Sequence, residues 1–218
     1  MAGTATYIDL HTHHASTGHG VSVFNNRFAH DPAYYTDSLF SIGVHPWDAG
    51  LVDDSSFREL EEWLAHPNCF ALGECGLDKL HGADFSLQKQ VFGMQLELAQ
   101  RHAMPVIIHC VRAFDELMEM ARPYAGKIPL VVHGFHKSAQ LAAQLTGKGF
   151  YLSLNPALFG RKDFDSSLIP LERLFLETDM REDLSIREVY QAAATWLNVD
   201  EEVLKERING NFEALKQK

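Results

Sequence analysis

Six residues of the kinds that bind metal ions stand at or just past the ends of short apolar runs. They are His11, His13, Glu74, His109, His133 and Asp179. Short apolar runs separated by helical stretches are typical of buried parallel strands. A (β/α) barrel builds its active site from residues at the C-terminal ends of such strands. The pattern therefore predicts an α/β chain folded as a parallel (β/α) TIM-type barrel with a metal centre at one end.

Strand-like and helix-like segments alternate along the chain with no linker or repeat between them. Hydrophobic periodicity predicts strands near 6–11, 21–24, 39–44, 69–74, 105–109, 129–133, 149–154 and 173–178. It predicts helices at 56–65, 86–103, 112–122, 138–147, 185–197 and 200–216. Ser-x-x-Glu capping patterns begin two of these helices, from Ser56 to Glu59 and from Ser185 to Glu188. Eight strands with intervening helices favour a closed barrel, and we expect residues 1–218 to form a single domain.

The barrel is expected to be trimmed between its first and third strands. Only residues 14–37 separate the His13 motif from the strand that begins near Ser38. This space holds one strand but not two crossover helices, since a parallel connection needs about a dozen residues each. We expect the remainder to run as an irregular loop over one side.

Composition indicates a cytoplasmic enzyme. With 19 basic and 29 acidic residues, the formal net charge is −10, which opposes nonspecific adhesion to nucleic acid or anionic membranes. A phosphate-bearing substrate must therefore be attracted locally, by a metal or a few basic side chains. Cys69, Cys75 and Cys110 lie in apolar runs and are odd in number, which favours free thiols in a reducing compartment over disulfides. We expect no export signal, no membrane span and no obligate protein partner.

The His11–His13 pair places two imidazoles on one face of a strand, because alternate side chains point the same way. Asp9 shares that face, one step deeper, and is expected to accept a hydrogen bond from a ligand histidine. The competing interpretation is a solvent-facing histidine-rich loop, since His14 and His19 follow. The matching residues farther along the chain favour a metal site.

A buried carboxylate at Glu74 costs several kcal/mol unless it is paired or bound to metal. A structural salt bridge is the alternative, but a carboxylate can also join two cations through its two oxygens, and we expect Glu74 to do so. His109 and His133 each follow a proline by four positions, at equivalent strand ends. Core histidines bonded to backbone are the alternative for either one alone. Cys110 should face away from His109, which disfavours a cysteine nucleophile.

Three further residues are candidates for binding substrate at the same rim. His45 ends the third predicted strand, Arg112 follows His109 by three positions, and His136 lies in the loop after His133. The histidines expected at the surface are His30, His66, His81 and His102.

The ordered motifs resemble those of the TatD family of metal-dependent deoxyribonucleases, which belongs to the amidohydrolase-like barrels. They are His-Thr-His13, Gly-Val-His45-Pro, Gly-Glu74-Cys-Gly-Leu-Asp, Pro-Val-Ile-Ile-His109, Val-Val-His133-Gly-Phe and Glu-Thr-Asp179. The resemblance covers nearly the whole chain. It implies that His11, His13, Glu74 and Asp179 hold one divalent ion, and that Glu74, His109 and His133 hold a second. The chain departs from the family pattern after His133 and Asp179, where the substrate rim is expected.

We therefore expect a metal-dependent hydrolase with one or two divalent ions, Zn²⁺, Mn²⁺ or Mg²⁺, that activate water. The expected substrate is DNA or a small phosphate ester. Asp179 is expected to orient the water and accept its proton, and Glu74 to join the ions. Two alternatives remain: an amidohydrolase that cleaves an amide or lactone at the same site, and a metal-binding homologue without activity.

Overall fold

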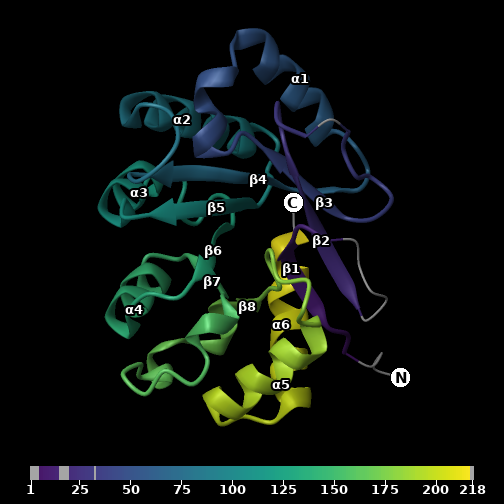
Figure 1. The fold of residues 1–218 in the computed structure, drawn as a ribbon, viewed down its shortest axis with the longest axis vertical. Helices are drawn as coiled ribbons and strands as arrows, with labels where there is room; N and C mark the ends of the chain where they lie inside the picture. The colour runs from purple at the N-terminus through teal and green to yellow at the C-terminus, as the bar shows by residue number, and fades with distance from the viewer. Residues whose placement is uncertain (1–4, 15–19, 32, 217–218) are drawn as a thin grey trace. The chain divides into compact units, whose positions relative to one another are not determined.

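The computed structural model describes residues 5–14, 20–31 and 33–216. Eight strands follow one another in chain order in one sheet, β1 to β8 (Figure 1). The strand pairs whose registers are defined are all parallel. At the end of β1, Thr12 forms a parallel bridge with Asp179, which follows β8, so the last strand returns to the first. This topology confirms the predicted parallel (β/α) barrel.

The chain consists of two compact units. The first combines Met1–Val23 with His133–Gln217, and the second is Phe24–Val132. Strands β2 (Val21–Arg27) and β6 (Leu130–Phe135) each contribute residues to both units. That residues 1–218 form a single domain stays a prediction.

In the first unit, helices cover the strands on which the N-terminal ligands lie. α6 contacts α5, β1 and β8, and α4 contacts β7. The phenol of Tyr190, on α5, is fully buried and bonds to both backbone groups of Ile8, accepting from the N–H (3.0 Å) and donating to the C=O (3.1 Å). This pair of bonds fixes β1 against α5. The elements are β1 (Ile8–Thr12), α4 (Ala139–Gly147), β7 (Tyr151–Leu154), η2 (Pro156–Leu158), η3 (Ser166–Leu168), η4 (Leu171–Arg173), β8 (Leu174–Leu176), α5 (Ile186–Leu197) and α6 (Glu201–Lys216).

In the second unit, β4 is the central element. It pairs with β3 and β5, and α1 and α2 pack against it. All ten of its residues are buried, as expected of a strand covered on both faces. The elements are β3 (Phe40–Gly43), η1 (Pro46–Leu51), α1 (Asp54–Leu64), β4 (Cys69–Asp78), α2 (Phe85–Arg101), β5 (Val106–Val111) and α3 (Phe114–Ala121).

Strand β4 extends four residues beyond its predicted end. Cys75 and Leu77 are fully buried and pair with Ile108 and Cys110 of β5, so the apolar pairing continues past Glu74. Glu74 consequently lies inside the strand rather than at its end. Strands β5 and β6 also continue two residues past their predicted ends, so His109 and His133 likewise lie inside their strands.

The two predicted capping boxes have different outcomes. Ser185 caps α5, and its reciprocal bonds with Glu188 confirm that prediction. The prediction for Ser56 and Glu59 is wrong: Asp53 caps α1, and Ser56 occupies the third helical position. The Asp53 carboxylate accepts bonds from the N–H groups of Ser55 (2.9 Å) and Ser56 (3.0 Å), so the helix begins two residues before its predicted start.

The connection between β1 and β3 is short, as predicted. Within its described parts, residues 13–14, 20–31 and 33–39, it contains β2 and no helix. β2 extends three residues beyond the predicted strand, to Arg27. His19, part of the predicted loop, lies outside the described residues.

Cys69, Cys75 and Cys110 are buried and form no disulfide, as predicted. Among residues 5–14, 20–31 and 33–216, none of the helices has the length and apolar character needed to cross a membrane.

Candidate active site

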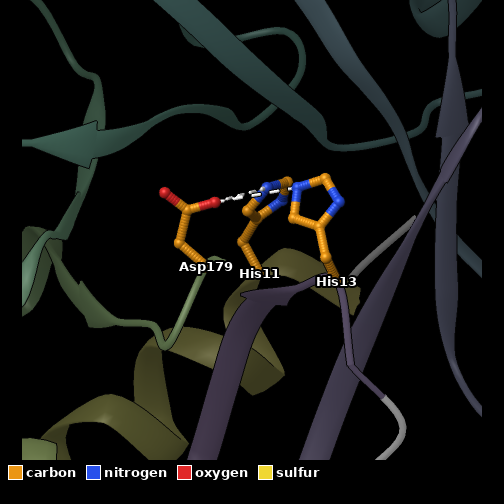
Figure 2. A group of neighbouring side chains, drawn as sticks. All are labelled: His11, His13 and Asp179. Atoms are coloured by element: carbon orange, nitrogen blue, oxygen red, sulfur yellow. Dashed lines mark ion pairs between the residues drawn. The ribbon is translucent and has the colours of Figure 1, made fainter. Parts of the chain in front are cut away.

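Three predicted metal ligands lie together in the first unit: His11, His13 and Asp179 (Figure 2). The two histidines are two positions apart at the end of β1, so their rings lie on the same side of the chain. Two backbone hydrogen bonds hold Asp179 beside them. Its N–H donates to the C=O of His11 (3.0 Å), and the N–H of His13 donates to its C=O (3.1 Å). The meeting of two strand ends thus brings the three side chains together.

The geometry of this group fits a divalent ion. The Nε2 atoms of His11 and His13 lie 3.8 and 3.7 Å from Asp179 Oδ1, farther apart than hydrogen-bonded atoms. Ligands about 2.1 Å from one tetrahedral ion are about 3.4 Å from each other, so small movements would suffice. The His11 side chain is fully buried, whereas those of His13 and Asp179 are 24% exposed, which leaves the group accessible on their side. Imidazole and carboxylate donors together suit Zn²⁺ or Mn²⁺.

His133 and Glu177 adjoin this group in the same unit. The rings of His133 and His11 lie 4.2 Å apart. Glu177 is fully buried, and its Oε1 accepts a bond from the N–H of Gly134 (2.7 Å) and lies 3.7 Å from His133 Nδ1. Burial raises the pKa of Glu177, and the neighbouring His133 opposes that shift. Glu177 was not among the predicted ligands, although its place two positions before Asp179 on one strand run was a usable signal.

Asp9 bonds to Thr178. Its carboxylate accepts bonds from the N–H (3.0 Å) and the hydroxyl (2.7 Å) of Thr178; a bond from a ligand imidazole stays a prediction. The Thr178 hydroxyl also lies 3.0 Å from that of Thr12. Burial raises the pKa of Asp9 to about 7, with the Thr178 bonds opposing the shift. Asp9 therefore ties the end of β8 to β1 and supports the ligands indirectly.

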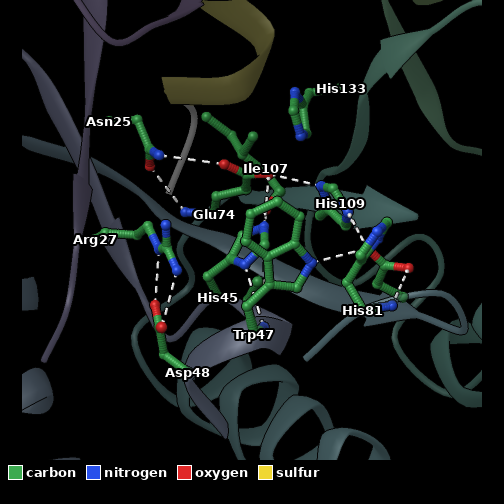
Figure 3. A network of polar contacts seen from close by, with 12 residues as sticks. Asn25, Arg27, His45, Trp47, Asp48, Glu74, His81, Ile107, His109 and His133 are labelled. Atoms are coloured by element: carbon green, nitrogen blue, oxygen red, sulfur yellow. Dashed lines mark hydrogen bonds and ion pairs between the residues drawn. The ribbon is translucent and has the colours of Figure 1, made fainter. Parts of the chain in front are cut away.

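A second group lies in the second unit and contains His45, Glu74 and His109 (Figure 3). Glu74 Oε1 lies 2.8 Å from His109 Nδ1 and 3.3 Å from His45 Nε2. The side chains of His45 and Glu74 are each 5% exposed, and that of His109 is 17% exposed. The structure therefore brings together the predicted ligands of the fourth and fifth strands and adds His45 to them.

The hydrogen bonds of His45 indicate how it acts in this group. The backbone N–H of Trp47 donates to His45 Nδ1 (3.2 Å), which leaves the proton of a neutral ring on Nε2, directed at Glu74. Burial lowers the pKa of His45, against the opposing effect of Glu74, and so favours the neutral ring. His45 is therefore placed to donate to Glu74, which leaves Glu74 and His109 as the ligand candidates of this unit.

Asn25 fixes the orientation of Glu74. Its Oδ1 accepts bonds from the N–H of Glu74 (3.0 Å) and the hydroxyl of Ser41 (3.3 Å), and its Nδ2 donates to Glu74 Oε2 (3.2 Å). Both oxygens of the Glu74 carboxylate thus have a partner: Oε2 accepts a bond from Asn25, and Oε1 lies beside His45 and His109. Asn25 was not among the predicted site residues, because an asparagine in a β-strand carries no signal of its partner.

Asp78 was also not predicted as a functional residue. It is the last residue of β4 and lies on the same face of that strand as Glu74 and Gly76. Its Oδ2 lies 3.5 Å from His109 Nε2 and accepts a bond from the indole N–H of Trp47 (2.8 Å). Burial would raise the pKa of Asp78, but the bonds from Trp47 and neighbouring N–H groups lower it below its usual value.

At Gly76, with φ +141°, an added Cβ would lie 2.0 Å from the His109 carbonyl oxygen, so only glycine allows β4 to approach β5 here.

The remaining predicted substrate residues lie in loops that follow the ligand strands. Arg112 comes directly after β5, is exposed and adopts a left-handed conformation with φ +53°. His136 comes directly after β6 and is exposed, with Nδ1 2.7 Å from the Gly134 carbonyl oxygen. Lys137 Nζ lies 3.1 Å from the other ring nitrogen of His136. Substrate contact by His45, Arg112 and His136, and the joining of two ions by Glu74, stay predictions.

The fold and the two groups define a (β/α) barrel protein with two clusters of residues that could hold metal ions. The family model described as TatD related DNase matches residues 9–217. This chain belongs to that family, as its motif order predicted.

Curated relatives and a solved structure agree with this assignment. The 3′-5′ ssDNA/RNA exonuclease TatD of Cronobacter turicensis is 34% identical over 66% of this chain and 58% of its own length. The uncharacterized metal-dependent hydrolase TatD of Mycobacterium tuberculosis is 30% identical over 64% of this chain and 56% of its own length. The chain thus aligns with little more than half of these relatives. The crystal structure of YJJV, a TatD homologue from Escherichia coli K12, has a TM-score of 0.82 at 23% identity and covers 97% of this chain and 98% of its own.

Proposed function

We propose that this chain is a metal-dependent hydrolase that cleaves phosphodiester bonds near the end of a single-stranded nucleic acid. The observation that carries the proposal is the group of His11, His13 and Asp179, whose ligand atoms lie at distances that suit a shared ion. Glu74 and His109 supply a second pair of ligand candidates. When bound, the divalent ion would lower the pKa of a water and polarise a phosphoryl oxygen.

The protein's own residues would position the ion's ligands and the attacking water. The His11 side chain is fully buried, while Asp179, partly exposed, is able to orient a water and accept its proton. Asn25 and His45 hold the Glu74 carboxylate from its two sides, so that it keeps one orientation. We propose Zn²⁺ or Mn²⁺ ahead of Mg²⁺, because imidazole is a better ligand for the first two.

The nucleic-acid substrate is supported by the relatives named 3′-5′ ssDNA/RNA exonuclease. A net charge of −10 disfavours binding along the length of a duplex, so attraction must be local. Arg112 and His136 are the proposed phosphate contacts. The three buried thiols, which form no disulfide, support a reducing compartment such as the cytoplasm.

The test combines metal analysis with substrate comparison. Purified protein is analysed for bound metals and then assayed, with added Mn²⁺, on a 3′-labelled single-stranded oligonucleotide, a small phosphodiester, and amide and lactone substrates. We expect at least one ion per chain and cleavage of the oligonucleotide. Asp179→Asn is the matched variant, and it should lose activity while unfolding at the same urea concentration as the parent. Cleavage of only the amide or lactone would assign the site to amidohydrolase chemistry, and bound metal without any turnover would indicate an inactive homologue.

A further inference from the structure

Trp47 is exposed although its position is fixed. Solvent reaches 45% of this residue. Its indole N–H donates to Oδ2 of Asp78 (2.8 Å), whose side chain is only 1% exposed. The ring meets that of His45 edge-on, with centroids 4.8 Å apart and an interplanar angle of 86° (Figure 3). The indole is therefore a rigid, flat and partly exposed surface rather than a mobile side chain.

The loop after β4 borders this surface. The His81 side chain is 65% exposed, and its ring lies 5.6 Å from that of Trp47 at an interplanar angle of 59°, so it flanks the indole. The N–H groups of Leu80 and His81 donate to Asp78 Oδ1 (2.7 and 3.2 Å), so one carboxylate fixes both the loop and the indole. A Cβ at Gly82 would lie 2.7 Å from Trp47 Cα, so the loop packs this closely only with glycine.

Arg27 supports the indole. Its guanidinium carbon lies 5.5 Å from the Trp47 ring centroid. Two hydrogen bonds to Asp48 (2.7 and 2.8 Å) hold the guanidinium in place. A cation held beside an indole stabilises it electrostatically, and the solvent-accessible part of the ring remains open to a ligand.

The exposed ring lies next to the ligand group of its own unit. Trp47 contacts His45, which faces Glu74, and its centroid is 6.3 Å from that of His109. A flat group stacked on this indole would therefore lie next to the proposed metal ligands Glu74 and His109. In a nucleotide, a single sugar separates the base from its phosphate, so a base on the indole would place its phosphate near these ligands.

We propose that Trp47 and His81 form a stacking platform for an unpaired nucleobase next to the phosphate that is cleaved. The proposal rests on the proposed function and narrows its substrate to a strand with an accessible terminal base, instead of a small ester or the interior of a duplex. Aromatic side chains bind single strands in this way because every base offers a π-face. An exposed tryptophan also provides a large contact area at low entropic cost.

Binding is tested with a probe that the enzyme does not consume. Trp63→Phe and Trp196→Phe together leave Trp47 as the only one of three tryptophans. This protein is titrated, in Mg²⁺, with a phosphorothioate tetrathymidylate and with the same strand lacking its 3′-terminal base. We expect the complete strand to quench Trp47 fluorescence and to bind about five- to 150-fold more tightly than the abasic strand. Equal binding of the two strands without quenching would overturn the platform.

Two substitutions separate stacking from mere support of Asp78. Trp47→Phe keeps a π-face but loses the indole N–H, whereas Trp47→Leu keeps apolar volume and loses both. Affinity for both strands is measured by competition, so that no tryptophan is needed. Stacking predicts that Trp47→Phe keeps most of the preference for the complete strand and that Trp47→Leu abolishes it. An equal loss in both variants, or a preference that survives Trp47→Leu, would refute stacking.

Hydrolysis is then measured on phosphodiester strands with and without the terminal base. Base-dependent binding without cleavage would keep the platform and reject the proposed function. Cleavage of both strands at equal kcat/KM, unchanged by Trp47→Leu, would keep the function and reject the platform.

Discussion

Glu74→Gln is the substitution whose consequence the structure defines most sharply. Glutamine preserves the side-chain volume but has one oxygen and one NH₂ group where glutamate has two oxygens. In the native site, Oε2 accepts a bond from Asn25 Nδ2 (3.2 Å), and Oε1 faces Nε2 of His45 (3.3 Å), which carries the proton of the neutral ring. Asn25 cannot turn its amide over, because its Oδ1 accepts the backbone N–H of Glu74 (3.0 Å). Either orientation of the glutamine therefore places its NH₂ against another donor.

The size of the effect follows from burial. The Glu74 side chain is 5% exposed, and removing one partner of a buried charged pair costs about 3–5 kcal/mol. This corresponds to a loss of roughly 150- to 5,000-fold in affinity for an ion held by Glu74. Activity should fall by several orders of magnitude, because a metal-assisted step is worth several kcal/mol. Isothermal titration with Zn²⁺ or Mn²⁺ measures the affinity for the ion, and oligonucleotide cleavage measures the activity.

A second-site change tests this reasoning directly. In Asn25→Asp combined with Glu74→Gln, the new carboxylate accepts the glutamine NH₂, so that the glutamine oxygen turns back toward His45 and His109. This double variant should recover part of the metal affinity lost in Glu74→Gln, whereas Asn25→Asp alone should weaken binding by placing two carboxylates side by side. Retention of more than about a tenth of the parental affinity and activity in Glu74→Gln would refute the reasoning and make Glu74 a structural residue.

Four other predictions concern the rest of the molecule. His11→Ala combined with His13→Ala should remove the ion of the first unit, and unchanged metal content by elemental analysis would refute that site. Tyr190→Phe leaves both backbone groups of Ile8 without their buried partner and should lower the free energy of unfolding by about 2–4 kcal/mol, measured in urea; a loss below about 0.5 kcal/mol would mean that other groups replace the phenol. Arg112→Ala should raise KM more than it lowers kcat if Arg112 only holds ground-state phosphate. Nucleic-acid binding should have a log–log salt slope of about −1 to −3, and a steep slope with tight duplex binding in a chelator would contradict local attraction.

The amino-acid sequence by itself determined the barrel and most of its ligand types. Buried parallel strands have a local sequence pattern, an apolar run with a histidine or carboxylate near its end, as at His109 and His133. This pattern does not show where a strand ends. β4 continues past Glu74 because Cys75 and Leu77 pair with β5, which is a property of two segments together.

Only the tertiary structure decided which groups surround each ligand. His45 looked like a rim residue in the sequence, and the fold places it behind Glu74 as a hydrogen-bond donor. Asn25 and Asp78 became part of the site in the same way. Hydrophobic periodicity reports the face of a strand on which a residue lies, but hydrogen-bond partners depend on the register between strands and on loop conformation. The Trp47 indole, fixed by a carboxylate 31 positions away, is a feature that no local pattern could have predicted.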